Sequence, residues 1–302
     1  MILTKLLKGR TDLYKNKSFI PLFIIPTVLL FCVVYAASLL ILVGSSFTDW
    51  SIGTKISFVG LSNYIKIITD DEDFRKSLIN TIIWIILQST IHIAIGVAFA
   101  LVLAKKEFYW KFARTSFMVP NIISGAAMGM LFLCILNPEY GAVNNFIKLL
   151  GFKDFSQNWF MDYSTAFLSV TMTWLPYAAV VTLLVLAEIA SMSESIFESA
   201  RIDGATEMQI NLYIIIPMLR NIIGTCVIIA GTSMVQKLDI IMMTTGGGPG
   251  NTTMNLPVYI YKSALMDNNF GYANTLGVIL VAIGIVFVLL TQRVFRFGKS
   301  DV

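Results

Sequence analysis

The feature that most constrains this chain is a series of apolar runs, each about 20 residues long and separated by shorter polar stretches. A helix of that length crosses the roughly 30 Å hydrocarbon core of a bilayer. Backbone groups inside lipid must be satisfied within the protein, and runs of this length are unlike the alternating ten-residue strands of a membrane barrel. Hydrophobic residues make up 56% of the chain and charged residues 13%. The sequence therefore predicts an all-α, polytopic membrane protein.

Six runs are predicted to cross the membrane, which places both termini on the same side. The predicted spans are residues 20–43, 78–104, 112–136, 165–190, 210–235 and 273–291. No internal repeat or low-complexity linker divides the chain, so residues 1–302 are expected to form a single transmembrane domain. Residues 1–18 form an N-terminal segment and residues 292–302 a C-terminal tail.

The basic residues orient the predicted spans. The net charge is +4, but the lysines and arginines are scattered between apolar runs, which argues against a nucleic-acid-binding face. Most of them fall on the side of the termini, where cytoplasmic loops carry an excess of Lys and Arg. They are Lys5, Lys8, Arg10, Lys15, Lys17, Lys105, Lys106, Lys111, Arg114, Arg201, Arg293, Arg296 and Lys299. We therefore expect a cell-membrane protein whose two termini are cytoplasmic.

Residues 191–209, between the fourth and fifth spans, form a polar segment on the same cytoplasmic side. Ser191 with Glu194 has the spacing of a capping box that begins a short helix, and Thr206 with Gln209 has the same spacing. Gly204 follows the first helix at the position where a left-handed residue commonly ends a helix. The pattern predicts a rigid helix-turn-helix elbow, which is more order than a simple connection needs.

The polar side of this elbow is mainly acidic. It carries Glu194, Glu198, Asp203 and Glu207 against Arg201. A helix that only rests on lipid headgroups usually presents Lys and Arg, because the inner leaflet is anionic. An acidic elbow instead suits a basic cleft on a soluble partner. Docking to a partner is the favoured interpretation, and an interfacial helix is the alternative.

Residues 198–205, ESARIDGA, with Ile216-Pro217 downstream, resemble the EAA loop of binding-protein-dependent ABC importer permeases. Residues 245–253, TGGGPGNTT, resemble the outer-loop signature of the carbohydrate-uptake group of that family. Residues 60–64, GLSNY, match the same group, so the resemblance extends over nearly the whole chain.

The resemblance implies that the short helix of the elbow is a coupling helix, seated in a groove of a cytoplasmic ATPase. The residues implied in ATPase coupling are Glu198, Ser199, Ala200, Asp203, Gly204 and Ala205. Ser199 stands where the family has its first alanine, a change of small residue for small residue. The resemblance further implies a second homologous permease subunit, two ATPase subunits, an extracytoplasmic solute-binding protein and a carbohydrate substrate.

The chain contains no G-x-x-x-x-G-K-[ST] phosphate-binding loop and no recurring set of nucleophile, base or metal ligands. We therefore expect no catalytic residue and no metal site in it, with ATP and Mg bound by the partner ATPase subunits. An ion-coupled secondary transporter is the alternative function. It would need an ionisable group near the bilayer midplane, and His92 is the candidate. A lone histidine beside Gln88 is more typical of a hydrogen-bonded packing residue.

A route for a sugar needs hydrogen-bonding groups and aromatic faces. Trp174 and Tyr177 flank Pro176, which must interrupt the fourth predicted helix. At the outer end of the fifth span are polar and charged residues that could also simply extend to the interface. Gln88 and Asn121 could equally serve interhelical hydrogen bonding. The candidate pathway residues are Trp174, Tyr177, Gln236, Lys237, Asp239, Asn121 and Gln88.

The outer glycine-rich loop follows these residues directly. Gly246, Gly247, Gly248 and Pro249 are not followed by the Lys and Ser/Thr of a phosphate cradle. Glycines permit positive φ angles and close approach of another backbone. We expect this loop to contact the solute-binding protein that delivers the cargo.

Overall fold

The computed structural model describes residues 19–104 and 108–295 of the chain. In this part the protein is built from helices, and its β-bridges are the isolated pairs Thr48–Phe58 and Ser51–Asn269. The all-α prediction is confirmed. The N-terminal segment 1–18, Lys105 and Lys106, and residues 296–302 of the predicted tail lie outside the described residues.

Four continuous helical stretches are long and apolar enough to cross a membrane, and each coincides with a predicted span. They are Pro21–Ser45, Glu72–Leu103, Ala166–Ser191 and Phe270–Phe295. The first three contain short π or 3-10 turns within the helix. The first stretch consists of α2 (Phe19–Phe31), η1 (Cys32–Ala36) and α3 (Ala37–Ser45), and the second of α5 (Glu72–Leu87), η2 (Gln88–His92) and α6 (Ile93–Leu103). The third consists of α10 (Ala166–Met172), η4 (Leu175–Tyr177) and α11 (Ala178–Ser191). The fourth is the single helix α18 (Phe270–Phe295).

The predicted third span is not one straight helix. It consists of α7 (Phe108–Met118), η3 (Val119–Ile122) and α8 (Gly125–Ile135), and the two halves are bent by 108°. Pro120 lies in the 3-10 turn. Ser124 has an extended backbone, and its Oγ accepts a hydrogen bond from the N–H of Ala127. A residue with that geometry begins a new helix, so the apolar run continues through a change of direction.

The predicted fifth span is bent as well. Its first part contains α13 (Glu207–Ile210), η5 (Asn211–Ile215) and α14 (Ile216–Met218), and it meets α15 (Arg220–Met234) at 68°. Pro217 has no N–H to donate to the preceding turn, which accounts for the π turn before it and the bend after it. The described residues thus hold four candidate spans, or six when each bent pair is taken as one.

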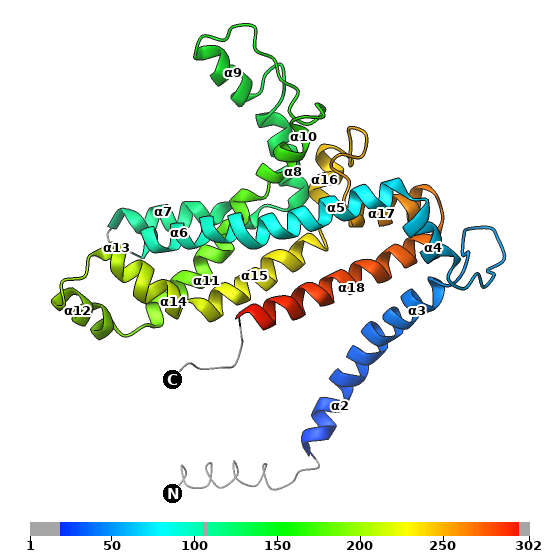
Figure 1. Ribbon diagram of the computed structural model, residues 1–302, viewed down its shortest axis with the longest axis horizontal. Helices are drawn as coiled ribbons and strands as arrows, with labels where there is room; N and C mark the ends of the chain where they lie inside the picture. The colour runs from blue at the N-terminus through cyan, green and yellow to red at the C-terminus, as the bar shows by residue number, and fades with distance from the viewer. Residues whose placement is uncertain (1–18, 105–107, 296–302) are drawn as a thin grey trace, which may run out of the picture.

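The bundle is formed by α5–α6, α11, α15 and α18, which lie side by side (Figure 1). Close approach of α6 and α11 is possible because Gly96 has no side chain, and Thr182 Oγ1 donates to the Gly96 carbonyl at 2.9 Å. The large apolar residues Trp84 and Trp174 are fully buried between these helices. Helix α3 contacts the start of α18 through its C-terminal end, and from there α3 and α2 diverge from the bundle and expose most of their side chains (Figure 1).

The two ends of the bundle differ. The elbow helix α12 (Glu194–Ile202) lies at one end, and α4 (Ser62–Thr69), α16 (Asp239–Thr244) and α17 (Leu256–Tyr261) with η6 (Lys262–Met266) gather at the other (Figure 1). Helix α9 (Ala142–Leu149) projects beyond the bundle from a long loop after α8. The candidate coupling elements and the candidate outer loop are therefore far apart.

Candidate functional site: coupling elbow, outer loop and inner chamber

The elbow turn has a defined hydrogen-bonded geometry. Asp203 ends α12, and Gly204 follows it with φ +82°. The N–H of Gly204 donates to the Arg201 carbonyl at 3.1 Å, and the N–H of Ala205 donates to the Ala200 carbonyl at 3.0 Å. These two bonds form a Schellman motif, which satisfies the last carbonyls of the helix and requires a left-handed residue at Gly204. The predicted role of Gly204 as a helix stop is confirmed.

The two capping boxes predicted for the elbow have different outcomes. Thr206 and Gln209 form one, with the Gln209 N–H donating to Thr206 Oγ1 and the Thr206 N–H donating to Gln209 Oε1. The box predicted for Ser191 with Glu194 is wrong. Ser191 is still helical and its hydroxyl donates to the Glu188 carbonyl, so it cannot adopt the extended backbone of an N-cap.

Helix α12 is held to the bundle by one face. Phe197 and Ala200 pack against the buried apolar cluster formed by α6, α11 and α15. Glu198, Ser199 and Asp203 are exposed on the outward side. The amphipathic pattern read from the sequence is therefore present, and its polar side faces away from the protein.

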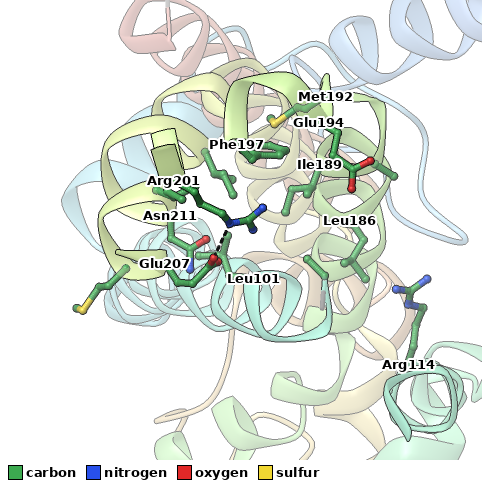
Figure 2. Close-up of a pocket in the computed structure, with 15 residues that line it drawn as sticks. Leu101, Arg114, Leu186, Ile189, Met192, Glu194, Phe197, Arg201, Glu207 and Asn211 are labelled. Carbon is green, nitrogen blue, oxygen red and sulfur yellow. Dashed lines mark hydrogen bonds and ion pairs between the residues drawn. The ribbon is translucent and has the colours of Figure 1, made fainter. Parts of the chain in front are cut away.

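A hollow of about 730 Å³ separates part of the elbow from the bundle (Figure 2). Its walls include apolar Leu186, Ile189 and Phe197, and Arg201 and Glu207 line it side by side. Arg201 Nε lies 2.9 Å from Glu207 Oε1, and this contact raises the pKa of Arg201. Both side chains are more than half exposed, so solvent screens the pair and it adds little stability. The elbow is thus internally rigid but is not packed solidly onto the helices behind it.

The glycine-rich loop of residues 245–253 is anchored to α5. Asn80 Nδ2 donates to the carbonyls of Thr252 and Met254 at 3.0 and 2.9 Å, and Asn251 Nδ2 donates to Asp73 Oδ1 at 2.7 Å. Within the loop, Thr253 Oγ1 donates to the Gly248 carbonyl.

Positive φ angles occur at Gly246 and Gly247, as the glycine pattern predicts. Gly247 is buried, whereas Gly246, Gly248 and Pro249 are half-buried and Gly250 is exposed. The accessible part of the loop is therefore its rim around Gly250, because Gly247 faces the interior.

Three candidate pathway residues from separate segments of the chain meet at one cavity. Gln88, Tyr177 and Lys237 line a chamber of about 180 Å³, together with His92 and Ser233. The Lys237 ammonium lies 4.8 Å from the centroid of the Tyr177 ring, a cation–π geometry. Burial lowers the pKa of Lys237, and the charge of Asp239 partly offsets this effect.

His92 was expected to be a hydrogen-bonded packing residue beside Gln88, and the structure buries both side chains but leaves His92 Nδ1 without a hydrogen bond in the described part of the chain. His92 Nδ1 and Gln88 Oε1 are both buried, and neither has a hydrogen-bond partner among the described residues. The two residues lie in the π turn η2, one helical turn apart, and line the same chamber.

The other four candidate pathway residues lie elsewhere. Trp174 is buried and, with Gln88 and His92, borders a separate void of about 40 Å³. Asn121 lies in the bend between α7 and α8, where its Nδ2 has no partner among the described residues. Gln236 is exposed. The Asp239 carboxylate lies against Gly125 at the start of α8, where the partial positive charge of the helix N-terminus favours it.

The chain matches the family described as binding-protein-dependent transport system inner membrane component over residues 92–297. It belongs to this family. The YurN protein of Bacillus subtilis strain 168, named a probable ABC transporter permease protein, is 28% identical over 291 residues, covering 95% of this chain and 99% of that protein. The multiple sugar-binding transport system permease protein MsmF of Streptococcus mutans is 31% identical over 247 residues, covering 81% and 84%.

The fold of the permease is also shared with a solved structure. A chain in the crystal structure of a bacterial alginate ABC transporter, in complex with an alginate pentasaccharide-bound periplasmic protein, superposes with a TM-score of 0.83 at 20% identity. The match covers 95% of this permease and 98% of that chain. The family match and the relatives therefore make the chain a multi-pass membrane permease of the ABC importer class. They do not support the alternative function, an ion-coupled secondary transporter.

Sequence reasoning missed two residues of the chamber in this permease, His92 as a polar lining residue and Ser233. The signal was present in the spacing. Gln88 precedes His92 by four residues, so the two share one helix face, and Ser233 lies on the last turn of α15 shortly before Lys237. Only the packing of α5, α11 and α15 shows that the two segments line the same space.

Proposed function

We propose that this chain is the permease subunit of an ABC importer that passes a carbohydrate into the cytoplasm by alternating access. In this proposal a solute-binding protein delivers the cargo at the end of α16 and α17, and two ATPase subunits bind ATP and Mg at the other end. A second homologous permease completes the path, and both termini are cytoplasmic. The relatives named for sugar transport support the carbohydrate class.

The observation that carries the proposal is the elbow. A helix closed by a Schellman motif and followed at once by a capping box behaves as a rigid unit, so a force applied to α12 is passed on to α13 and α15. The exposed Glu198 and Asp203 give the outward side a negative charge suited to a basic groove. The hollow behind the elbow leaves room for the rigid unit to move against the bundle.

A substitution at Gly204 in the elbow should uncouple solute transport from ATP hydrolysis. A carbon atom added there meets nothing within 4 Å, so Gly204→Asp changes the charge and strains the turn without disturbing the core. We expect the variant to insert and assemble, while solute uptake per ATP hydrolysed falls at least tenfold, a value on the order of 1.4 kcal/mol of coupling.

The measurement uses the complete complex in proteoliposomes, with uptake and phosphate release followed together. A screen of neutral and acidic oligosaccharides, polyols and glycerol phosphates first identifies a transported solute. Gly53→Asp is a matched control, because Gly53 has the same φ of +82° and the same open surroundings but lies at the opposite end of the molecule. Normal coupling in Gly204→Asp would contradict the proposal.

A further inference from the structure

The chamber between α5, α11 and α15 contains a cation, Lys237, that has no ion-pair partner among the described residues. The Lys237 side chain is half-buried, and no carboxylate of the described residues forms an ion pair with it. Asp239 is two residues away and its charge acts on Lys237, but its carboxylate lies against the start of α8 and forms no ion pair with Lys237. A cation taken from water is costly unless an anion or several acceptors compensate for the lost hydration. The Tyr177 ring supplies only part of that compensation.

The same chamber contains polar groups that lack partners. Gln88 is 4% exposed and His92 is 6% exposed, and each has a buried polar atom without a hydrogen bond in the described part of the chain. A buried amide and imidazole of this kind cost free energy until something bonds to them. A hydroxyl group fits both, because it can donate or accept whichever way the amide and the ring are oriented.

The space is too large for a single water molecule. A water needs on the order of 10–15 Å³ of such volume, whereas this chamber has about 180 Å³. Its remaining walls are apolar side chains of α11 and α15, among them Val181, Leu184 and Ile229. A cavity with apolar walls and a few convergent polar groups is typical of a small-molecule site.

We infer that Lys237, Gln88 and His92 form a transient subsite for an acidic saccharide, in which Lys237 holds a carboxylate or sulfonate and Gln88 and His92 bind neighbouring hydroxyls. The inference rests on the proposed import function and specifies its substrate class. A neutral sugar would satisfy the amide and the imidazole but would leave the cation without an anion. A simple inorganic anion would pair with Lys237 but would leave the two buried polar groups unsatisfied.

The test compares acidic and neutral saccharides in the complete reconstituted importer. The probes are labelled di- to pentasaccharides of galacturonate, glucuronate and mannuronate and a sulfonated glycoside, each beside its neutral counterpart. We expect the wild-type complex to import at least one acidic probe. Lys237→Gln should reduce that import roughly tenfold or more, the loss expected for one charge-assisted hydrogen bond. Lys237→Arg should retain most of it, and Gln88→Leu should lower it.

Two controls separate this result from a general defect. Lys55→Gln removes a lysine charge from an exposed outer loop and should leave import unchanged. Affinity of the solute-binding protein for the probe should be the same throughout, since that protein is not altered. Purified complexes of the Lys237 variants should keep the subunit ratio of the wild type.

Three outcomes would overturn the inference. The first is that the importer takes up neutral probes alone, or no probe at all. The second is that Lys237→Gln leaves import of the acidic probe unchanged. The third is that the Lys237→Gln complex fails to assemble, which would place the partner of this charge on a neighbouring subunit. An importer restricted to neutral sugars that still uncouples in Gly204→Asp would retain the proposed function and lose only the acidic-saccharide subsite.

Discussion

Single glycines in this protein are required for different physical reasons. Gly204 is needed for its backbone, since its φ of +82° is left-handed and a side chain there would have open space. Gly96 is needed for its size, because a carbon added there would lie 2.5 Å from Val181 Cβ. The role of Gly204 can be predicted from its position after a helix. The role of Gly96 cannot, because it depends on which helix packs against α6.

Gly96→Ala should therefore destabilise the bundle. The added methyl would force α6 and α11 apart where Thr182 bonds to the Gly96 carbonyl, an overpacking cost of about 1–3 kcal/mol. Unfolding of the purified permease in a denaturing-detergent titration measures the change. Gly44→Ala, where nothing lies within 4 Å, is the control and should show no loss of stability. Equal stability of the two variants would contradict the close contact between α6 and α11.

At the scale of the elements, the elbow shows which parts of a helix-turn-helix segment follow from local sequence. Its turn and second capping box follow local rules, because each depends on residues within six positions of one another. The first predicted box failed because α11 continues through Ser191 and Ser193 takes the N-cap position. Local patterns thus locate a helix start to within about two residues but do not choose among neighbouring serines.

Thr206→Ala should loosen the start of α13 while leaving α12 intact. Loss of an N-cap costs about 1 kcal/mol, which corresponds to roughly a fivefold rise in local opening. Amide hydrogen exchange of residues 207–210 in the assembled complex is the measurement. Ser191→Ala is the comparison, and since Ser191 caps nothing, the exchange of α12 should not change. Faster exchange of α12 in Ser191→Ala would show that Ser191 and Glu194 form a capping box after all.

The whole molecule has two chemically distinct ends joined by apolar helices. The acidic elbow lies at one end, and the loops around α4, α16 and α17 lie at the other (Figure 1). The exposed apolar length of α2 and α3 is consistent with contact with lipid or another subunit. Function in this arrangement depends on which end faces the cytoplasm.

The positive-inside pattern predicts that the elbow is cytoplasmic. In a background with Cys32, Cys134 and Cys226 replaced by alanine, Glu198→Cys should react with a membrane-impermeant maleimide only after the membrane is opened. Lys55→Cys, exposed at the opposite end, should react in intact cells. The reverse pattern would place the elbow outside and would remove the basis for ATPase coupling.

The sequence alone determined the features that depend on composition and short spacing. The length of the apolar runs required helices in lipid, the distribution of lysines and arginines indicated an orientation, and ESARIDGA indicated the coupling elbow. Four of the predicted spans appear as continuous helices for this reason. Hydropathy is a sum over neighbouring residues, so it does not depend on the rest of the fold.

The tertiary structure alone decided the bends and the chamber. Hydropathy cannot distinguish a straight span from one bent by 108° at Ser124 or by 68° at Leu219, because it depends on residue composition and not on backbone direction. Gln88 and Tyr177 come from two helical turns and Lys237 from the segment between α15 and α16, while the Asp239 carboxylate lies beside the start of α8. Whether a charge is paired or left facing a cavity depends on side chains far apart in the chain, and their positions are set by helix packing.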